Sequence, residues 1–148
     1  MIMSDRVVLQ RGFVVKSPPN HQHRWHKRLC TLTLEPVGDI ERFMKKYHKD
    51  YNKESIVALN SLSRHLVFSY YKDEDDENEE KAIKKFIISS LRRVIDYPSG
   101  ANNYTYIIKL LLGDIYNNRE ILLCFEDKGE QQNWFRSFDT SMQSSLPE

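Results

Sequence analysis

The stretches GFVVKSPP (residues 12–19) and WHKRLCTL (residues 25–32) carry the strongest structural signal in this chain. The first belongs to a run of β-branched and aromatic residues, 7–16, whose composition predicts a strand. Gly12 within this run indicates a bend or a close backbone approach. Pro18 and Pro19 end the strand, because proline fixes φ and lacks an N–H donor. Strand-forming residues return over 21–34, so we expect the chain to open with a β-hairpin.

Beyond the hairpin, five more short segments predict strands, each bounded by Pro, Gly, Asn or Asp. They span residues 65–72, 82–89, 92–97, 104–112 and 120–125, with turns expected at 98–103 and 113–118. Residues 73–80 read DEDDENEE, with seven acidic side chains that repel one another. This segment is predicted to be an exposed, mobile loop that points away from any anionic surface.

A helical insertion is predicted at about residues 35–64, between the second and third strands. Apolar side chains at positions 40, 43, 44 and 47 have the i, i+3, i+4, i+7 spacing of an amphipathic helix. This helix is expected to end near Tyr51 or Asn52. Its apolar stripe either packs against the domain or offers a second binding surface.

The final helix has its own start signal. Asp127 can cap its first turn, and Glu130 stands three residues later, as in a capping box. Trp134, Phe138 and Met142 then form an apolar stripe that faces a core. The sequence therefore predicts a mainly β fold, a bent sandwich or barrel of about seven strands capped by one C-terminal α-helix.

Composition limits the function classes. The 148 residues suit one domain, 1–148, with its core at about 7–142. The net charge of +1 gives no general attraction to polyanions, and no nucleic-acid partner is expected. Cys30 and Cys124 lie in apolar segments and are expected to be reduced core thiols of a cytoplasmic protein. No apolar run reaches the roughly 18 residues of a membrane span, and residues 1–6 lack the features of a signal peptide.

Sites of catalysis or metal binding are not predicted. His21, His23 and His26 lack a Cys or carboxylate at metal-site spacing, so no metal or other cofactor is expected. The sequence has no nucleophile elbow, phosphate-binding glycine loop or paired catalytic carboxylates. We therefore expect a module without enzymatic activity.

The order of elements resembles that of the pleckstrin-homology (PH) domain, and several motifs are most similar to those of Gab-type docking adaptors. GFVVKSPP resembles their opening GWLIKSPP, and WHKRLCTL resembles their second strand WRKRWFVL. Tyr70 and Tyr71 resemble their paired tyrosines, residues 81–84 (KAIK) resemble their KPIR, and Trp134 is similar to the tryptophan of their closing helix. The resemblance covers about residues 7–142, outside the insertion.

This resemblance implies a function. Such domains bind phosphoinositides, here with a preference for 3-phosphorylated headgroups, and recruit an adaptor to the cytosolic face of the plasma membrane downstream of receptor tyrosine kinases. The family's binding pattern corresponds to Lys16, His26 and Arg28. His26 departs from the pattern, because an imidazole stands where a fixed cation is expected. If its charge holds a phosphate, affinity should rise from about pH 7.5 to about pH 6.

Strand alternation supports the hairpin as a site without the resemblance. Residues 11–28 contain five Lys or Arg and no acid. Alternation places Arg24, His26 and Arg28 on one face, which Cys30 and Leu32 continue into the interior. Cations at the mouth of such a face suit a ligand with several phosphates. The alternative is that they are ordinary solvated strand residues.

Further contributors to the site are left open by the sequence. Tyr71 either donates its hydroxyl to a phosphate at the rim or packs on its strand. Only one of Lys84 and Lys85 can face the pocket. The predicted phosphoinositide site comprises Lys16, Arg24, His26, Arg28, Tyr71 and Lys84. The main alternative function is a PH-fold protein–protein interaction module without significant lipid binding, which would bind partners of the parent adaptor through the insertion or the last helix.

Overall fold

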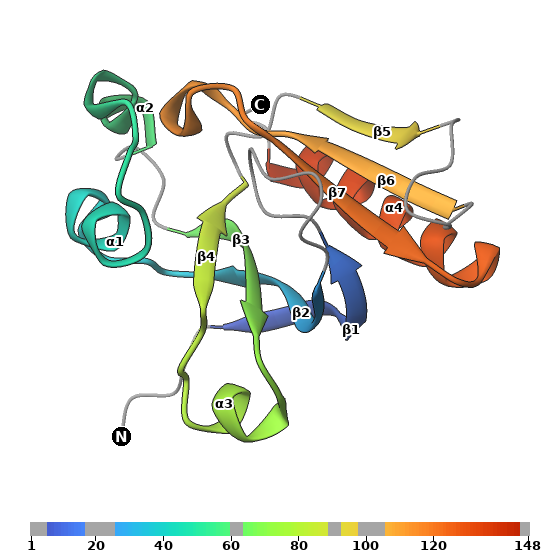
Figure 1. Ribbon diagram of the computed structural model, residues 1–148. Coiled ribbons are helices and arrows are strands. Elements are labelled where there is room, and N and C mark those ends of the chain that lie inside the picture. Colours follow the sequence, from blue (N-terminus) through green and yellow to red (C-terminus); the bar gives the residue numbers. More distant parts are fainter. Residues whose placement is uncertain (1–5, 17–25, 60–63, 89–92, 98–105, 146–148) are drawn as a thin grey trace.

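The computed structural model describes residues 6–16, 26–59, 64–88, 93–97 and 106–145 (Figure 1). Seven antiparallel strands form one sheet in the order β4-β3-β2-β1-β7-β6-β5. The strands are β1 (Val7–Lys16), β2 (His26–Glu35), β3 (His65–Tyr71), β4 (Lys84–Ile87), β5 (Arg93–Tyr97), β6 (Tyr106–Leu111) and β7 (Glu120–Phe125). The predicted seven-stranded fold with a C-terminal helix is confirmed.

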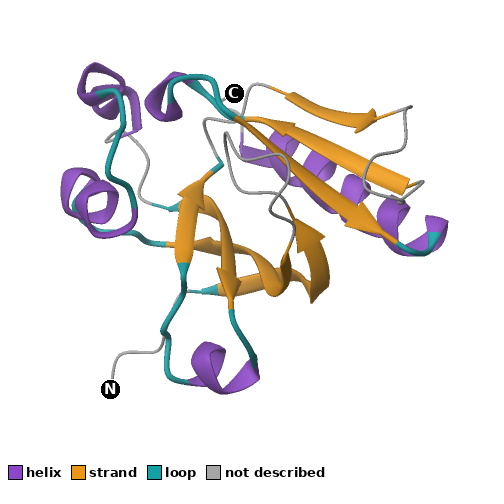
Figure 2. Cartoon of the chain, in the orientation of Figure 1, coloured by secondary structure: helices purple, strands orange, loops and turns teal. Residues whose placement is uncertain are grey.

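The two halves of the sheet meet at β1. This strand pairs with β2 along its length, up to Lys16 opposite His26. Its pairing with β7 is limited to Val15 opposite Cys124 and Lys16 opposite Leu123. The sheet therefore divides into β1–β4 and β5–β7, which lie in different directions, with the helix α4 (Lys128–Ser145) beside the second group (Figure 2).

Helix α4 closes the core between the two halves. Trp134 and Phe138 are fully buried, and their rings lie 6.5 Å and 6.0 Å from the ring of Phe68 on β3. Asp127 caps the helix, because its carboxylate accepts a hydrogen bond from the Gly129 N–H at 2.6 Å. Gly12 of β1 passes close to this helix. A Cβ atom there would lie 3.9 Å from Trp134 Nε1, an ordinary contact distance.

The insertion is helical, but its first helix is shorter than predicted. Helix α1 (Ile40–Tyr47) is followed by a 3-10 turn (Lys53–Ser55) and by α2 (Ile56–Leu59). The predicted end near residue 51 is wrong, because His48 leaves the helix with extended backbone angles. Its ring is buried between Phe86 and Tyr116, at centroid distances of 4.8 Å and 4.9 Å.

His48 and Tyr116 also satisfy the free edge of β4. The backbone carbonyl of Lys85 lies 2.7 Å from His48 Nε2, and the Ile87 N–H donates to the Tyr116 hydroxyl at 2.6 Å. A carbonyl only accepts, so Nε2 carries the proton. Burial lowers the pKa of His48 to about 4, which keeps the ring neutral. The insertion thus covers a strand edge that would otherwise expose backbone groups.

The acidic segment is more ordered than predicted. Asp73 caps a short helix, α3 (Glu74–Asn78), by accepting from the Asp76 N–H. Glu77 accepts hydrogen bonds of 2.8 Å and 3.0 Å from the Arg11 guanidinium, and its side chain is only 12% exposed. The expected mobile loop is corrected to a helix attached to β1. Within the described residues, no helix is long and apolar enough to cross a membrane.

Candidate functional site

Lys16, the last residue of β1, is the centre of the candidate site. Its side chain is buried at 3% exposure, and Nζ lies 4.0 Å from the centroid of the Tyr70 ring on β3. This cation–π contact partly replaces water around the ammonium group. Within the described part of the chain, no carboxylate forms a salt bridge with it. A buried lysine without an acidic partner is uncommon in a folded protein.

The buried position of Lys16 changes its pKa. Burial, together with the nearby charges of Arg28 and Lys84, lowers the pKa of Lys16 to about 8 from its ordinary 10.5. The neighbouring Cys30 thiol is buried as well, which raises its pKa to about 12. That thiol is therefore neutral near pH 7 and gives Lys16 no compensating charge.

The strand register explains why the cations meet. In antiparallel pairs, directly opposite residues point to the same face. Lys16 lies opposite His26, and Val14 lies opposite Arg28. Cys30, two residues after Arg28, lies opposite Tyr70, which in turn lies opposite Lys84. Lys16, His26, Arg28 and Lys84 therefore share one face of the sheet, at the end where β1 leads toward β2 and β3 toward β4. His26 is exposed, whereas Arg28 and Lys84 are half-buried.

Two further cations lie near Lys84 that the sequence pattern did not indicate, Lys49 from the insertion and Arg119 directly before β7. Burial lowers the pKa of Lys84, and the charges of Arg119 and Lys49 act in the same direction. Arg119 is partly neutralised by Asp50, at 2.8 Å. Among the described residues, Lys49 forms no salt bridge. The basic surface thus extends from the hairpin toward the residues that follow α1.

Other predicted site residues lie elsewhere. Tyr71 is 2% exposed and lies opposite Leu29, on the face away from Lys16, so its predicted donation to a phosphate does not fit its position. Tyr70, the other tyrosine of the pair, lies beside Lys16 instead. Lys85 is on the far face and pairs with Glu35 at 3.2 Å. Arg24 lies outside the described residues.

The remaining expectations for site chemistry concern thiols and metals. Cys30 and Cys124 are both free and buried, which confirms them as core thiols. Among the described residues, no group of three or more His, Cys, Asp or Glu side chains could hold a metal ion.

A known structure has a similar fold. It is the solution structure of the PH domain of human pleckstrin homology domain-containing protein family A member 5. The alignment covers 100% of this chain and 88% of that chain, with a TM-score of 0.58. The chain has the PH fold. At 16% sequence identity the likeness extends to the fold alone.

Neither a protein-family model nor a curated protein matches this sequence. The similarity to Gab-type adaptors therefore remains a prediction from the quoted motifs.

The Lys16 face lies at the end of the sheet where β7 begins, because β7 runs antiparallel to β1. The chain segments that follow β1, β3 and β6 all leave the sheet at this end.

Proposed function

We propose that this chain binds the headgroup of a multiply phosphorylated phosphoinositide through Lys16, Arg28 and Lys84, with His26 assisting. The observation that supports the proposal most directly is the buried Lys16 ammonium, which has cationic neighbours and no carboxylate partner among the described residues. The module would act by reversible recruitment to the cytosolic face of a membrane, without catalysis.

The energetics favour an anionic ligand. A buried cation beside like charges destabilises the folded state, and an anion placed among the three side chains would offset both desolvation and repulsion. Arg28 offers a planar pair of donors and the two lysines offer point charges, which suits the several oxygens of phosphate groups. One carboxylate would neutralise only one of these cations. Several phosphates on one ring match the set better.

The finer assignment rests on the motif resemblance. It implies a preference for 3-phosphorylated lipids and an adaptor role downstream of receptor tyrosine kinases. Arg24 is included in the proposed site because strand alternation places it on the same face as His26 and Arg28. The structural relative supports neither point, because its similarity extends only to the fold.

Vesicle co-sedimentation tests the proposal. The full chain is mixed with neutral vesicles that contain a few per cent of one phosphoinositide from a panel covering all phosphorylation patterns. We expect binding to multiply phosphorylated lipids. Lys16→Ala with Arg28→Ala should lower affinity by about two to four orders of magnitude, since each charge-assisted hydrogen bond is worth roughly 1.5–3 kcal/mol. Lys27→Ala is the matched control, because Lys27 is exposed and alternates to the other face of β2. Equal losses in the control and the double variant would contradict a specific site.

A further inference from the structure

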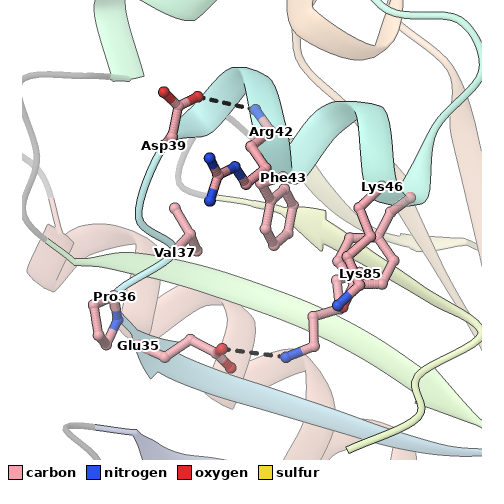
Figure 3. A pocket seen from close by; sticks show the side chains of 9 residues that line it. Glu35, Pro36, Val37, Asp39, Arg42, Phe43, Lys46 and Lys85 are labelled. Carbon is pink, nitrogen blue, oxygen red and sulfur yellow. Dashed lines mark hydrogen bonds and ion pairs between the residues drawn. The ribbon is translucent and has the colours of Figure 1, made fainter.

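A cleft lies between the insertion and the end of β2, away from the Lys16 face. Its volume is about 260 Å³, and residues from α1, from the segment after β2 and from β4 line it. In Figure 3, Arg42 and Phe43 reach from α1 toward Val37 and the Glu35–Lys85 ion pair. This volume is below the roughly 300–1,000 Å³ of small-molecule pockets. The cleft therefore fits one anchoring side chain of a longer ligand.

The acids at this cleft are already occupied. Glu35 accepts from Lys85 at 3.2 Å and from the Thr33 hydroxyl at 2.5 Å. Asp39 accepts from the Arg42 backbone N–H at 2.9 Å, where it caps α1. Glu35 is therefore neutralised by Lys85, whereas Asp39 keeps its negative charge at the N-terminus of α1.

Two cations at the cleft have no such partner. Arg42 and Lys46 are one helical turn apart on α1, both exposed, and neither forms a salt bridge among the described residues. Lys46 Nζ contacts the Tyr47 ring at 5.2 Å, which does not neutralise it. Lys45 is paired with Glu41 at 3.4 Å. Because Lys85 and Glu35 neutralise each other, the two cations Arg42 and Lys46 outnumber the one remaining acid, Asp39, at the rim of the cleft.

Apolar surface lies directly beneath these charges. Phe43 belongs to the hydrophobic core, while Val37 and Tyr47 are half-buried and pack against it. A ligand that complements the cleft must combine an apolar or aromatic side chain with flanking negative charge. Carboxylates next to an aromatic residue in an extended peptide have this combination.

We propose that this cleft is a docking site for an acidic peptide segment of a partner protein. An aromatic anchor residue of the peptide contacts Val37 and Phe43. Its flanking carboxylates meet Arg42 and Lys46. This function is additional to headgroup binding, uses different residues and allows the module to hold a membrane and a protein at the same time.

Fluorescence anisotropy with the full chain tests the site. The probe is the fluorescein-labelled peptide EEDFDEE, and the comparison peptides are QQNFNQQ, which lacks charge, and EEDSDEE, which lacks the anchor. We expect EEDFDEE to bind and both comparison peptides to bind about tenfold more weakly. Absence of EEDFDEE binding, or equal binding of EEDSDEE, would overturn the proposal.

Variants separate the cleft from general charge attraction and from the lipid site. Arg42→Ala with Lys46→Ala should weaken EEDFDEE binding about tenfold without changing the melting temperature, because both side chains are exposed. Two controls should bind like the wild type: Lys45→Ala, which removes one cation from the same helix, and Lys16→Ala with Arg28→Ala, which removes as many charges as the double variant. An equal loss in Lys45→Ala overturns the site. The proposal is also overturned if Arg42→Ala with Lys46→Ala loses vesicle binding but keeps peptide binding, because that result would assign α1 to the membrane.

Discussion

The Nζ atom of Lys16 lies 4.0 Å from the centroid of the Tyr70 ring, deep in the mouth of the sheet. The ring supplies a weak electrostatic partner that needs no formal negative charge. The ammonium group is therefore held in place by an interaction that leaves its positive charge available. A carboxylate at the same position would neutralise the lysine and repel a phosphate.

This arrangement predicts that Lys16 destabilises the ligand-free domain. Burial lowers its pKa to about 8 from 10.5, which corresponds to about 3 kcal/mol at roughly 1.4 kcal/mol per unit. Replacement by a neutral side chain of similar length, Lys16→Met, should raise the free energy of unfolding by about 1–3 kcal/mol while abolishing vesicle binding. Urea denaturation measures the change.

The control is Lys27→Met, at an exposed position, which should change stability by less than about 0.5 kcal/mol.

The pH dependence of stability gives a second check. The pKa of Lys16 is lower in the folded protein than in the unfolded chain, so the unfolded chain binds more protons between about pH 8 and 10.5. The free energy of unfolding of the wild type should therefore increase as pH rises through that range. The advantage of Lys16→Met should shrink accordingly. A variant less stable than the wild type at pH 7 would refute this account.

Ligand binding should reverse the effect on the lysine. A phosphate beside Lys16 stabilises the charged form of the lysine and raises its pKa. The protein should therefore take up protons when it binds the headgroup near pH 8.5. At higher pH, where the lysine deprotonates, headgroup affinity should fall. Calorimetry with a soluble headgroup in two buffers of different ionisation enthalpy measures the uptake. Lys16→Arg, which stays charged, should show little. Equal uptake in both proteins would place the titrating group elsewhere.

Local pattern was enough to predict most residues of the candidate site, because each step depended on neighbours in the chain. The prolines after Lys16 end β1, and alternation assigns Arg28 to the inner face. Alternation also shows that Tyr70 and Tyr71 point in opposite directions, but it does not show which faces Lys16. That depends on the pairing of Tyr70 with Cys30, an interaction across 40 residues. The same holds for the choice between Lys84 and Lys85.

The insertion shows where local pattern fails. Its apolar spacing predicts a helix, yet α1 ends just before His48, whose ring packs against Phe86 and Tyr116 and not along the helix. Lys49 comes near Lys84 because its neighbour His48 is hydrogen-bonded to the Lys85 carbonyl at 2.7 Å, and the Asn52 N–H donates to the Ile115 carbonyl at 2.9 Å. Contacts between distant segments set these positions.

His48 should make the domain sensitive to acid. Its folded pKa of about 4 is below the ordinary 6.5, so the unfolded chain binds the proton first, and stability is lost as pH falls from about 6.5 to 4. His48→Gln, which can still donate to the Lys85 carbonyl but does not titrate, should lose less stability over this range. Thermal unfolding from pH 7 to pH 4 measures the difference. Parallel pH profiles for the two proteins would contradict the assignment.

The Arg11–Glu77 ion pair should hold the acidic segment away from the basic site. Residues 73–80 connect β3 to β4 at the same end of the sheet as Lys16 and Lys84, but the pair draws α3 toward the side of β1 that carries Arg11. Arg11→Ala should free α3 and bring its carboxylates within reach of the cations. Cleavage by a glutamate-specific protease should then become several-fold faster, and vesicle affinity should fall.

The cost to global stability should be small, about 1 kcal/mol or less, because the Arg11 side chain is 42% exposed. This separates release of α3 from general unfolding. Lys81→Ala is the matched control, since Lys81 and Glu79 form a more exposed pair in the same segment, at 69% and 59% exposure. It should leave vesicle binding unchanged. If Arg11→Ala accelerates cleavage but leaves vesicle affinity intact, the acidic segment does not act on the site. Unchanged cleavage would show that capping by Asp73, and not the ion pair, holds α3 in place.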